Sequence, residues 1–158
     1  MNKELRIGTL ALPEGWSARV DASFIEPPTA IASDARMRNP AKEIAGARIT
    51  ISRGRAENDD IDAGQALGAF IDFMLQNTAS ARKLADAAFV FDDGVSGRCT
   101  LVQVDVDDGM TWLQSHIYRV DEGIITHLTL SVIAAQSARL EGDLRLVAAS
   151  YSPAAATR

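Results

Sequence analysis

The sequence predicts an α+β domain in which a twisted antiparallel sheet of about six strands is flanked by two main helices. Three observations predict this class: short segments of alternating apolar and polar residues, two segments with a helical period, and an acidic turn motif that occurs three times. With 158 residues, of which 47% are hydrophobic, the chain is long enough to bury a sizeable core. We therefore expect residues 1–158 to form a single domain.

The first half of the chain contains the strands that precede the repeated motif. The segments "LRIGTLALPEGW" and "ARVDASFIEPP" each predict one short strand, ended by a Pro-x-Gly turn in the first and by two prolines in the second. Residues 29–46 have no clear period and predict a long loop. The segment "ARITISR" alternates, with Ala47, Ile49 and Ile51 on one face and Arg48, Thr50 and Ser52 on the other.

Two segments have the period of an amphipathic helix. In "ENDDIDAGQALGAFIDFMLQNTAS" the apolar residues recur at helical spacing: Leu67, Phe70, Ile71, Met74 and Leu75. This stripe suits a partner, but core packing is the favoured interpretation. In "AAQSARLEGDLRLVAASY" the corresponding residues are Leu140, Leu144, Val147 and Tyr151. Residues 152–158 are predicted to be a flexible tail.

An acidic turn motif is repeated between the two helices. The segments "FDDGV", "VDDGM" and "VDEGI" begin at residues 91, 106 and 120. Acid pairs followed by glycine favour a three-residue hairpin loop, in which a type I turn precedes a glycine at positive φ. Three such loops join four strands at 82–91, 95–106, 110–120 and 124–134, so the sequence predicts a four-strand antiparallel meander.

The third turn decides how the two histidines lie. With a three-residue loop at 121–123, His116 faces Leu128 and His127 faces Ile117. Side chains alternate along a strand, so the two imidazoles are predicted to lie on opposite faces of the sheet. A two-residue loop would instead bring them together. We therefore predict no histidine dyad.

The same register predicts that both faces of the meander are half apolar. One face is predicted to carry Val102, Val104, Trp112, Gln114, His116, Leu128 and Leu130. A sheet with one covered face normally alternates apolar and polar residues more strictly. Two arrangements remain open: the helices cover one face each, or both cover one face and the other is a groove for a guest or a second copy of the chain.

Composition and motifs favour a binding protein over an enzyme. The net charge of −5 and a pI near 5.0 argue against nucleic acid or an anionic membrane surface as partner. The single cysteine, Cys99, suits a reducing cytosol, and we expect a cytoplasmic protein without a secretory signal or membrane helix. There is no G-x-S-x-G motif, no phosphate-binding glycine loop and no His/Cys cluster with metal-ligand spacing, so no catalytic residue, cofactor or metal is predicted.

Four short motifs carry a resemblance to a known superfamily. The segments "LALPEGW", "ITISR", "LQSHIYR" and "ITHLTLS" resemble the DcrB-like, PsbP-type fold superfamily, and within it the Eag chaperones of type VI secretion effectors. The resemblance implies a cytoplasmic, dimeric, non-catalytic chaperone. Such a chaperone binds the hydrophobic N-terminal transmembrane helices of a secreted effector and shields them before export.

The resemblance also suggests which residues bind the effector. Ser52 and Gln114 match polar groove residues of these chaperones. Together with the predicted face, they give the candidate partner-binding set: Thr50, Ser52, Val102, Val104, Trp112, Gln114, His116, Leu128 and Leu130. The main alternative is an immunity protein or another protein-binding module on the same fold. A small-ligand-binding protein or an enzyme is the third possibility.

Overall fold

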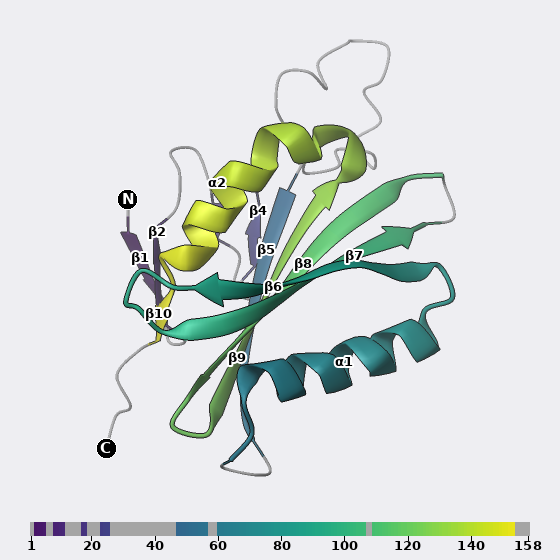
Figure 1. Cartoon of the computed structure of the whole chain (residues 1–158). Coiled ribbons are helices and arrows are strands. Elements are labelled where there is room, and N and C mark those ends of the chain that lie inside the picture. Colours follow the sequence, from purple (N-terminus) through teal and green to yellow (C-terminus); the bar gives the residue numbers. More distant parts are fainter. Residues whose placement is uncertain are drawn as a thin grey trace.

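The structure is a computed structural model that describes residues 2–5, 8–11, 17–18, 23–25, 47–56, 60–106 and 109–153. The predicted loop at 29–46 lies outside these residues. The α+β class is confirmed: an antiparallel sheet carries one helix on each face (Figure 1). In the order of the chain the elements are β1 (Asn2–Leu5), β2 (Gly8–Ala11), β3 (Ser17–Ala18), β4 (Ser23–Ile25), β5 (Ala47–Arg55), α1 (Ala63–Asn77), β6 (Ala81–Val90), β7 (Ser96–Asp105), β8 (Thr111–Asp121), β9 (Ile124–Ile133), α2 (Ser137–Ala149) and β10 (Ser152–Pro153).

The main sheet has the strand order β3-β4-β5-β9-β8-β7-β6. Strands β6 to β9 form the predicted meander, and β5 pairs with β9 on its far side. A smaller sheet has the order β1-β2-β10. Strand β2 confirms the strand predicted in "LRIGTLALPEGW", whereas β1 was not predicted, and β10 contains the first two residues of the predicted tail.

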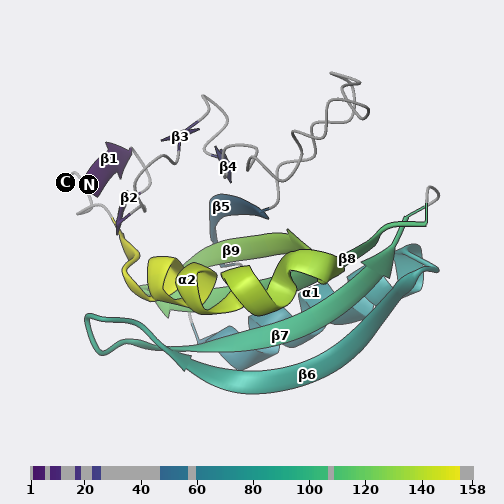
Figure 2. The same cartoon turned by 90° about the horizontal axis from the view of Figure 1, so that it is seen from above.

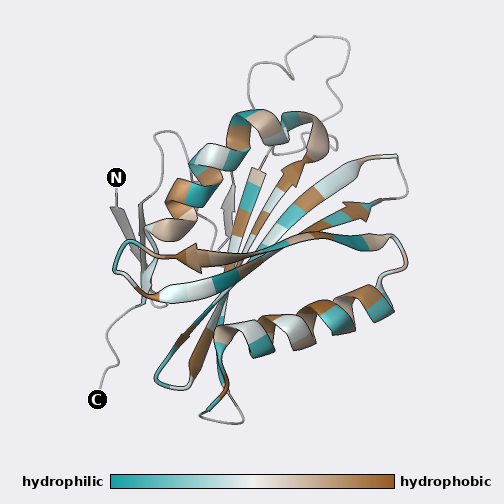
Figure 3. Ribbon diagram, viewed as in Figure 1, coloured by the Kyte–Doolittle hydropathy of each residue, from teal (hydrophilic) through white to brown (hydrophobic). Residues whose placement is uncertain are grey.

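The two helices cover opposite faces of the main sheet (Figure 2). Helix α2 packs Leu140, Leu144 and Val147 onto one face, in a core that includes Ile49 and Leu130. Helix α1 packs on the other face, in a second core that combines Ala66, Leu67 and Ile71 of the helix with Val102 and Tyr118 of the sheet. Of the two arrangements that the sequence left open, the structure has the one with a helix on each face. Figure 3 shows the apolar and polar segments alternating along both helices.

Helix α1 begins with a capping box. The side chain of Asp62 accepts a hydrogen bond from the backbone N–H of Gln65 at 2.8 Å, and the Gln65 side chain accepts one from the backbone N–H of Asp62 at 3.3 Å. These bonds satisfy amide groups that have no partner within the helix. Among the described residues, no helix is long and apolar enough to cross a membrane.

Two of the three repeated turns have the predicted three-residue loop. In each, the backbone N–H of the residue before the loop donates to the carbonyl of the residue after it: Phe91 to Val95 at 3.0 Å, and Val106 to Met110 at 2.9 Å. Their glycines, Gly94 and Gly109, have positive φ as expected. The register between β7 and β8 is therefore the predicted one, with Val102 opposite Gln114.

The third turn differs, and the prediction for β9 was wrong. Asp121 pairs directly with Ile124, and the loop contains only Glu122 and Gly123, with φ of 49° and 76°. Two consecutive residues at positive φ are typical of a type I′ hairpin turn. The shortened loop turns every side chain of β9 to the opposite face from the one predicted. As a result, Leu128 and Leu130 are buried under α2, away from Trp112 and Gln114.

Candidate binding face

Helix α1 covers only part of its face of the sheet. It packs mainly on β6, β7 and β8 and reaches β9 at His127 through Phe70. A band along β5, the rest of β9 and one end of β8 is left that no helix of the described residues covers. We call this band the open strip. It consists of Arg48, Thr50 and Ser52 of β5, Thr129 and Ser131 of β9, and Trp112 and Gln114 of β8.

The position of the strip follows from the alternation of side chains along β5. Because Ala47, Ile49 and Ile51 face the α2 core, the residues between them face the other side. Arg48 and Ser52 are exposed and Thr50 is half-buried. Strand pairing sets Arg48 beside Ser131, Thr50 beside Thr129 and Ser52 beside His127. The result is a row of hydroxyl groups with one cation at its end.

A groove of about 250 Å³ lies at one end of the strip. It is lined by Arg48, Val104, Val106, Trp112, Gln114 and Ser131. Trp112 and Gln114 are both half-buried. The groove combines an aromatic ring, two aliphatic side chains, an amide and a guanidinium, which is the mixed composition of a protein-binding surface.

A second, larger groove lies between β5, β9 and the first half of α1. It has a volume of about 500 Å³ and is lined by Ser52, Gly54, Arg55, Ala56, Ile61, Ala66, Ala69, Tyr118, Ile125 and His127. Most of its lining is apolar or small. It continues the strip past Ser52 toward the two histidines.

The candidate residues divide into three groups. Thr50, Ser52, Val104, Trp112 and Gln114 lie on the strip or in its groove. Val102 and His116 lie on the same face, but α1 covers them, and only 0% and 3% of their surfaces are exposed. The face prediction was wrong for Leu128 and Leu130, which lie under α2.

The two histidines meet, contrary to the prediction. His116 pairs with Thr129 and His127 pairs with Tyr118, so all four face the α1 side. His116 Nδ1 lies 3.0 Å from His127 Nε2, and Thr129 Oγ1 lies 3.0 Å from the same Nε2. The Phe70 ring of α1 covers the pair, with ring centroids 5.2 Å from His116 and 4.7 Å from His127. We call His116, His127, Thr129 and Tyr118 the histidine cluster.

Burial keeps both imidazoles neutral. It lowers the pKa of His116 to about 4. Burial, together with repulsion from His116, lowers the pKa of His127 to about 3. At neutral pH each ring therefore offers one nitrogen lone pair and one N–H. No carboxylate among the described residues is hydrogen-bonded to either ring, so the pair lacks the third group that orients a general base.

Other reactive groups in the described part of the chain are paired or unreactive. Burial raises the pKa of the Cys99 thiol, which disfavours the nucleophilic thiolate. An opening of about 640 Å³ between α1 and strands β6 and β7 contains Lys83, Asp86 and Thr100. Lys83 and Thr100 both bond to Asp86 and lower its pKa. No group of three or more His, Cys, Asp or Glu within the described ranges is placed to hold a metal ion.

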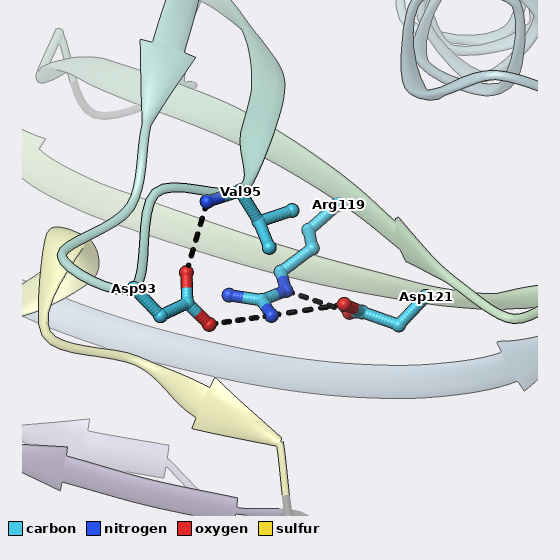
Figure 4. Close-up of polar contacts among 4 residues, drawn as sticks. All are labelled: Asp93, Val95, Arg119 and Asp121. Atoms are coloured by element: carbon cyan, nitrogen blue, oxygen red, sulfur yellow. Dashed lines mark hydrogen bonds and ion pairs between the residues drawn. The ribbon is translucent and has the colours of Figure 1, made fainter.

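The acidic turns have a second role that the motif alone did not indicate. Arg119 of β8 is 2% exposed and binds both Asp121, at 2.6 and 2.9 Å, and Asp93, at 2.6 Å (Figure 4). Asp93 also accepts a hydrogen bond from the Val95 N–H at 3.1 Å. Two of the three repeated turns are therefore tied together by one arginine, which also lies over the Phe91 ring at 5.0 Å.

Three features of the structure were not predicted from the sequence, two on this face and one, Arg119, on the α2 face. Thr129 and Ser131 were absent from the candidate set, because the predicted register placed them on the other side. Arg48 was also absent, although "ARITISR" placed this residue beside Thr50 and Ser52. Arg119 could have been found from its position two residues before Asp121, because side chains at i and i+2 share a strand face.

Comparisons with known proteins support the fold. No protein-family model and no curated protein matches the sequence. The solved structure of CyanoP, the cyanobacterial PsbP of Synechocystis sp. PCC 6803, is similar with a TM-score of 0.66 and 13% identity, over 98% of this chain and 92% of CyanoP. PA94 of Pseudomonas aeruginosa, a protein of unknown function, has a TM-score of 0.65 and 14% identity, over 98% of this chain and 96% of its own.

A third similar structure is LpqN of Mycobacterium tuberculosis, a protein involved in cell envelope biogenesis. Its TM-score is 0.60 at 13% identity, over 91% of this chain and 81% of LpqN. At these identities the likeness concerns the fold. The predicted PsbP-type fold is confirmed.

Proposed function

We propose that this chain is a non-catalytic protein-binding adaptor, and that its open strip binds an apolar helix of a partner protein. The observation that carries the proposal is the asymmetry between the two faces of the sheet. The face under α2 is filled with large aliphatic side chains, whereas the strip beside α1 keeps hydroxyl, amide and aromatic groups half-exposed. Aromatic and arginine side chains, here Trp112 and Arg48, are enriched at protein–protein interfaces.

The dimensions of the strip suit a helix. The strip and the larger groove that continues it follow β5 from Arg48 to Arg55, and the nine residues of this strand correspond to a length of about 30 Å. A helix of about 20 residues has the same length, which is also the hydrophobic thickness of a bilayer. A transmembrane-type segment lying along β5 and β9 would therefore be covered over its whole length.

The chemistry of the strip suits the same guest. Helices in membranes associate through close packing of small residues and through hydrogen bonds from Ser, Thr and Gln side chains. Thr50, Ser52 and Thr129 offer hydroxyl groups along the strip, and Gln114 offers an amide at one end. Trp112 beside Gln114 provides apolar area. An apolar helix rich in glycine and alanine is thus the guest that this surface favours.

The finer proposal concerns the biological partner. The resemblance to Eag chaperones points to the hydrophobic N-terminal helices of a type VI secretion effector, shielded in the cytoplasm before export. The names of the similar structures, a PsbP protein, a protein of unknown function and a cell-envelope protein, describe no catalytic activity. They support a binding role and leave the partner to experiment.

The proposal includes a homodimer, as in the chaperones that the sequence resembles. Strand β6 lies at the end of the main sheet, and Leu84 and Val90 on it are 46% and 62% exposed. An uncovered edge strand is a surface on which a second copy can pair. If this is correct, size-exclusion chromatography with light scattering will give twice the monomer mass. The substitution Leu84→Lys should then lower the fraction of dimer. A monomer at all concentrations would remove this part of the proposal.

A defined peptide tests the binding proposal. We expect a labelled peptide of about 20 residues, rich in leucine with alanine and glycine in a small-xxx-small pattern and flanked by lysines, to bind with a Kd on the order of micromolar by fluorescence anisotropy. Gln114→Ala should weaken binding about tenfold, because it removes one hydrogen bond in an apolar contact. A peptide of equal charge in which leucine replaces the small residues should bind more weakly, because it cannot approach the sheet as closely.

The control is Gln103→Ala. It also removes an amide, but Gln103 faces the α2 side of β7 and bonds to Asp105. Its peptide affinity should equal that of the unmodified protein. Equal loss in both variants, or no binding of the small-residue peptide at all, would contradict the proposal.

A further inference from the structure

Three donor atoms of the histidine cluster lie at the corners of a small triangle. His116 Nδ1 and His127 Nε2 are 3.0 Å apart, Thr129 Oγ1 is 3.0 Å from His127 Nε2, and the same oxygen is 3.5 Å from His116 Nδ1. They come from adjacent strands, β8 and β9, whose pairing holds His116 opposite Thr129. The triangle is therefore built on the sheet itself and not on a loop.

We propose that His116, His127 and Thr129 form a binding site for a divalent transition-metal ion, best matched to Zn²⁺. Zinc binds imidazole nitrogens at about 2.0–2.1 Å in tetrahedral geometry, which places neighbouring donor atoms about 3.3 Å apart. The three observed separations lie on either side of this value. An ion slightly above the plane of the triangle reaches all three atoms with small movements of the side chains.

The donor set suits zinc chemically. Imidazole is a ligand for zinc and for other divalent transition metals, and only the neutral ring coordinates. The hydroxyl of Thr129 is a weaker third donor, so the fourth position is left to water or to a ligand from outside the chain. The site resembles a catalytic zinc site in having an open position, but it has only two strong ligands.

The surroundings provide both cover and access. Phe70 packs on both rings from the α1 side, which limits the water around the ion. His127 also lines the groove of about 500 Å³ beside α1, and this groove gives an ion and its water a route to the cluster. The inference rests on this geometry. Thr129 is shared with the open strip, but the zinc titration does not require the helix-binding function proposed above.

The chain is well suited to a direct test, because His116 and His127 are its only histidines. Untagged protein freed of metal with a chelator is titrated with Zn²⁺ in a calorimeter. We expect one equivalent to bind with micromolar or tighter affinity. His116→Gln and His127→Gln should each weaken binding by about 100-fold or more, because each removes one of only two strong ligands. Thr129→Val should weaken it by about tenfold.

The matched control is Thr111→Val. Thr111 is also on β8, but its hydroxyl bonds to Asp105 and its side chain points to the other face. Zinc affinity of this variant should be unchanged. Circular dichroism of each variant without metal checks that the fold is kept.

A second measurement does not depend on any variant. Nitrogen NMR of the histidine rings should show zinc on Nδ1 of His116 and on Nε2 of His127, the two atoms that face each other. Binding that survives both histidine substitutions would overturn the inference. So would the absence of binding at millimolar Zn²⁺, or a spectrum in which the opposite ring nitrogens carry the metal.

Discussion

At the scale of single residues, Arg119 explains why the acidic turns matter for stability. The side chain is buried, yet its charge is shared between Asp93 and Asp121, whose side chains are 36% and 25% exposed. Burial disfavours the cation, and hydrogen bonds from Arg119 to both carboxylates more than offset it, which raises the pKa of the guanidinium above its ordinary value. One side chain thus holds two hairpin ends together.

The first prediction concerns this arginine. Arg119→Ala should lower the free energy of unfolding by about 2–3 kcal/mol. This loss is smaller than the loss on breaking a fully buried ion pair, because the two carboxylates are partly exposed and regain water. Urea unfolding measures the loss. The control is Lys83→Ala, which breaks the ion pair with Asp86 where both side chains are exposed, at 46% and 37%. Such a pair contributes about 0–1 kcal/mol, so equal losses in the two variants would contradict our account.

At the scale of elements, the turn between β8 and β9 decides the candidate site. A three-residue loop would have placed Leu128, Leu130 and Val132 on the α1 face. The two-residue loop places them in the α2 core, where burial of each large aliphatic side chain contributes about 1.5–3 kcal/mol. This gain exceeds the cost of about 1–2 kcal/mol for one non-glycine residue in the left-handed region, Glu122.

The second prediction tests that balance. Gly123→Ala should destabilise the protein by about 1–2 kcal/mol, because alanine must then adopt a φ of 76°. Glu122→Asn should be neutral or stabilising, because asparagine followed by glycine is the preferred pair for a type I′ turn. Thermal or urea unfolding compares the two variants. Stabilisation by Gly123→Ala would mean that the turn has a different conformation.

The same turn also brings the histidines together. Moving β9 by one residue relative to β8 moves His127 from the α2 side to the α1 side, beside His116 and Thr129. Thr129 and Ser131 of β9 then face the open strip, where Thr129 is half-buried and Ser131 is buried. The hairpin thus separates an apolar side of β9 from a polar one.

At the scale of the whole molecule, the sheet is the middle of three layers. Helix α2 covers one face, and α1 covers β6, β7 and β8 on the other. A single helix about 10 Å wide covers two or three strands at a spacing of about 4.8 Å. Strand β5 and the part of β9 beyond His127 therefore lie outside the area that α1 covers, and the open strip is a consequence of geometry.

The third prediction concerns the pH dependence of folding. In the unfolded chain both histidines titrate near 6.5, whereas burial lowers their pKa to about 4 and about 3 in the folded protein. Between these values the unfolded state binds more protons, so the free energy of unfolding should fall as the pH drops from about 6.5 toward 4. Urea unfolding in the presence of a chelator measures this slope.

The matched variant isolates the histidines from the carboxylates, which also titrate in acid. In the double variant with His116→Gln and His127→Gln, the part of the slope between pH 6.5 and 5 should disappear, since no buried imidazole remains to be protonated. A slope that is identical with and without the two histidines would mean that they are accessible to protons in the native state.

Local sequence patterns are sufficient to predict the type and order of the main elements. Alternation in "ARITISR" and helical spacing of Leu67 and Ile71 depend only on local geometry, which is why β5 and α1 were predictable. Two acidic turns followed the preferred three-residue geometry, and they placed Trp112 and Gln114 correctly beside Val102 and Val104. These features require no knowledge of what packs against them.

The conformation of the third turn, and the register of β9 that depends on it, are set by long-range packing. The segment "VDEGI" is compatible with a loop of two or three residues, because glycine provides a positive φ in either. The choice was made by distant partners: the α2 core that takes up Leu128 and Leu130, and Arg119, which keeps Asp121 within the strand. A slip of one residue moves every side chain of β9 to the other face of the sheet. Long-range packing therefore placed the two histidines together, and placed Thr129 and Ser131 on the open strip.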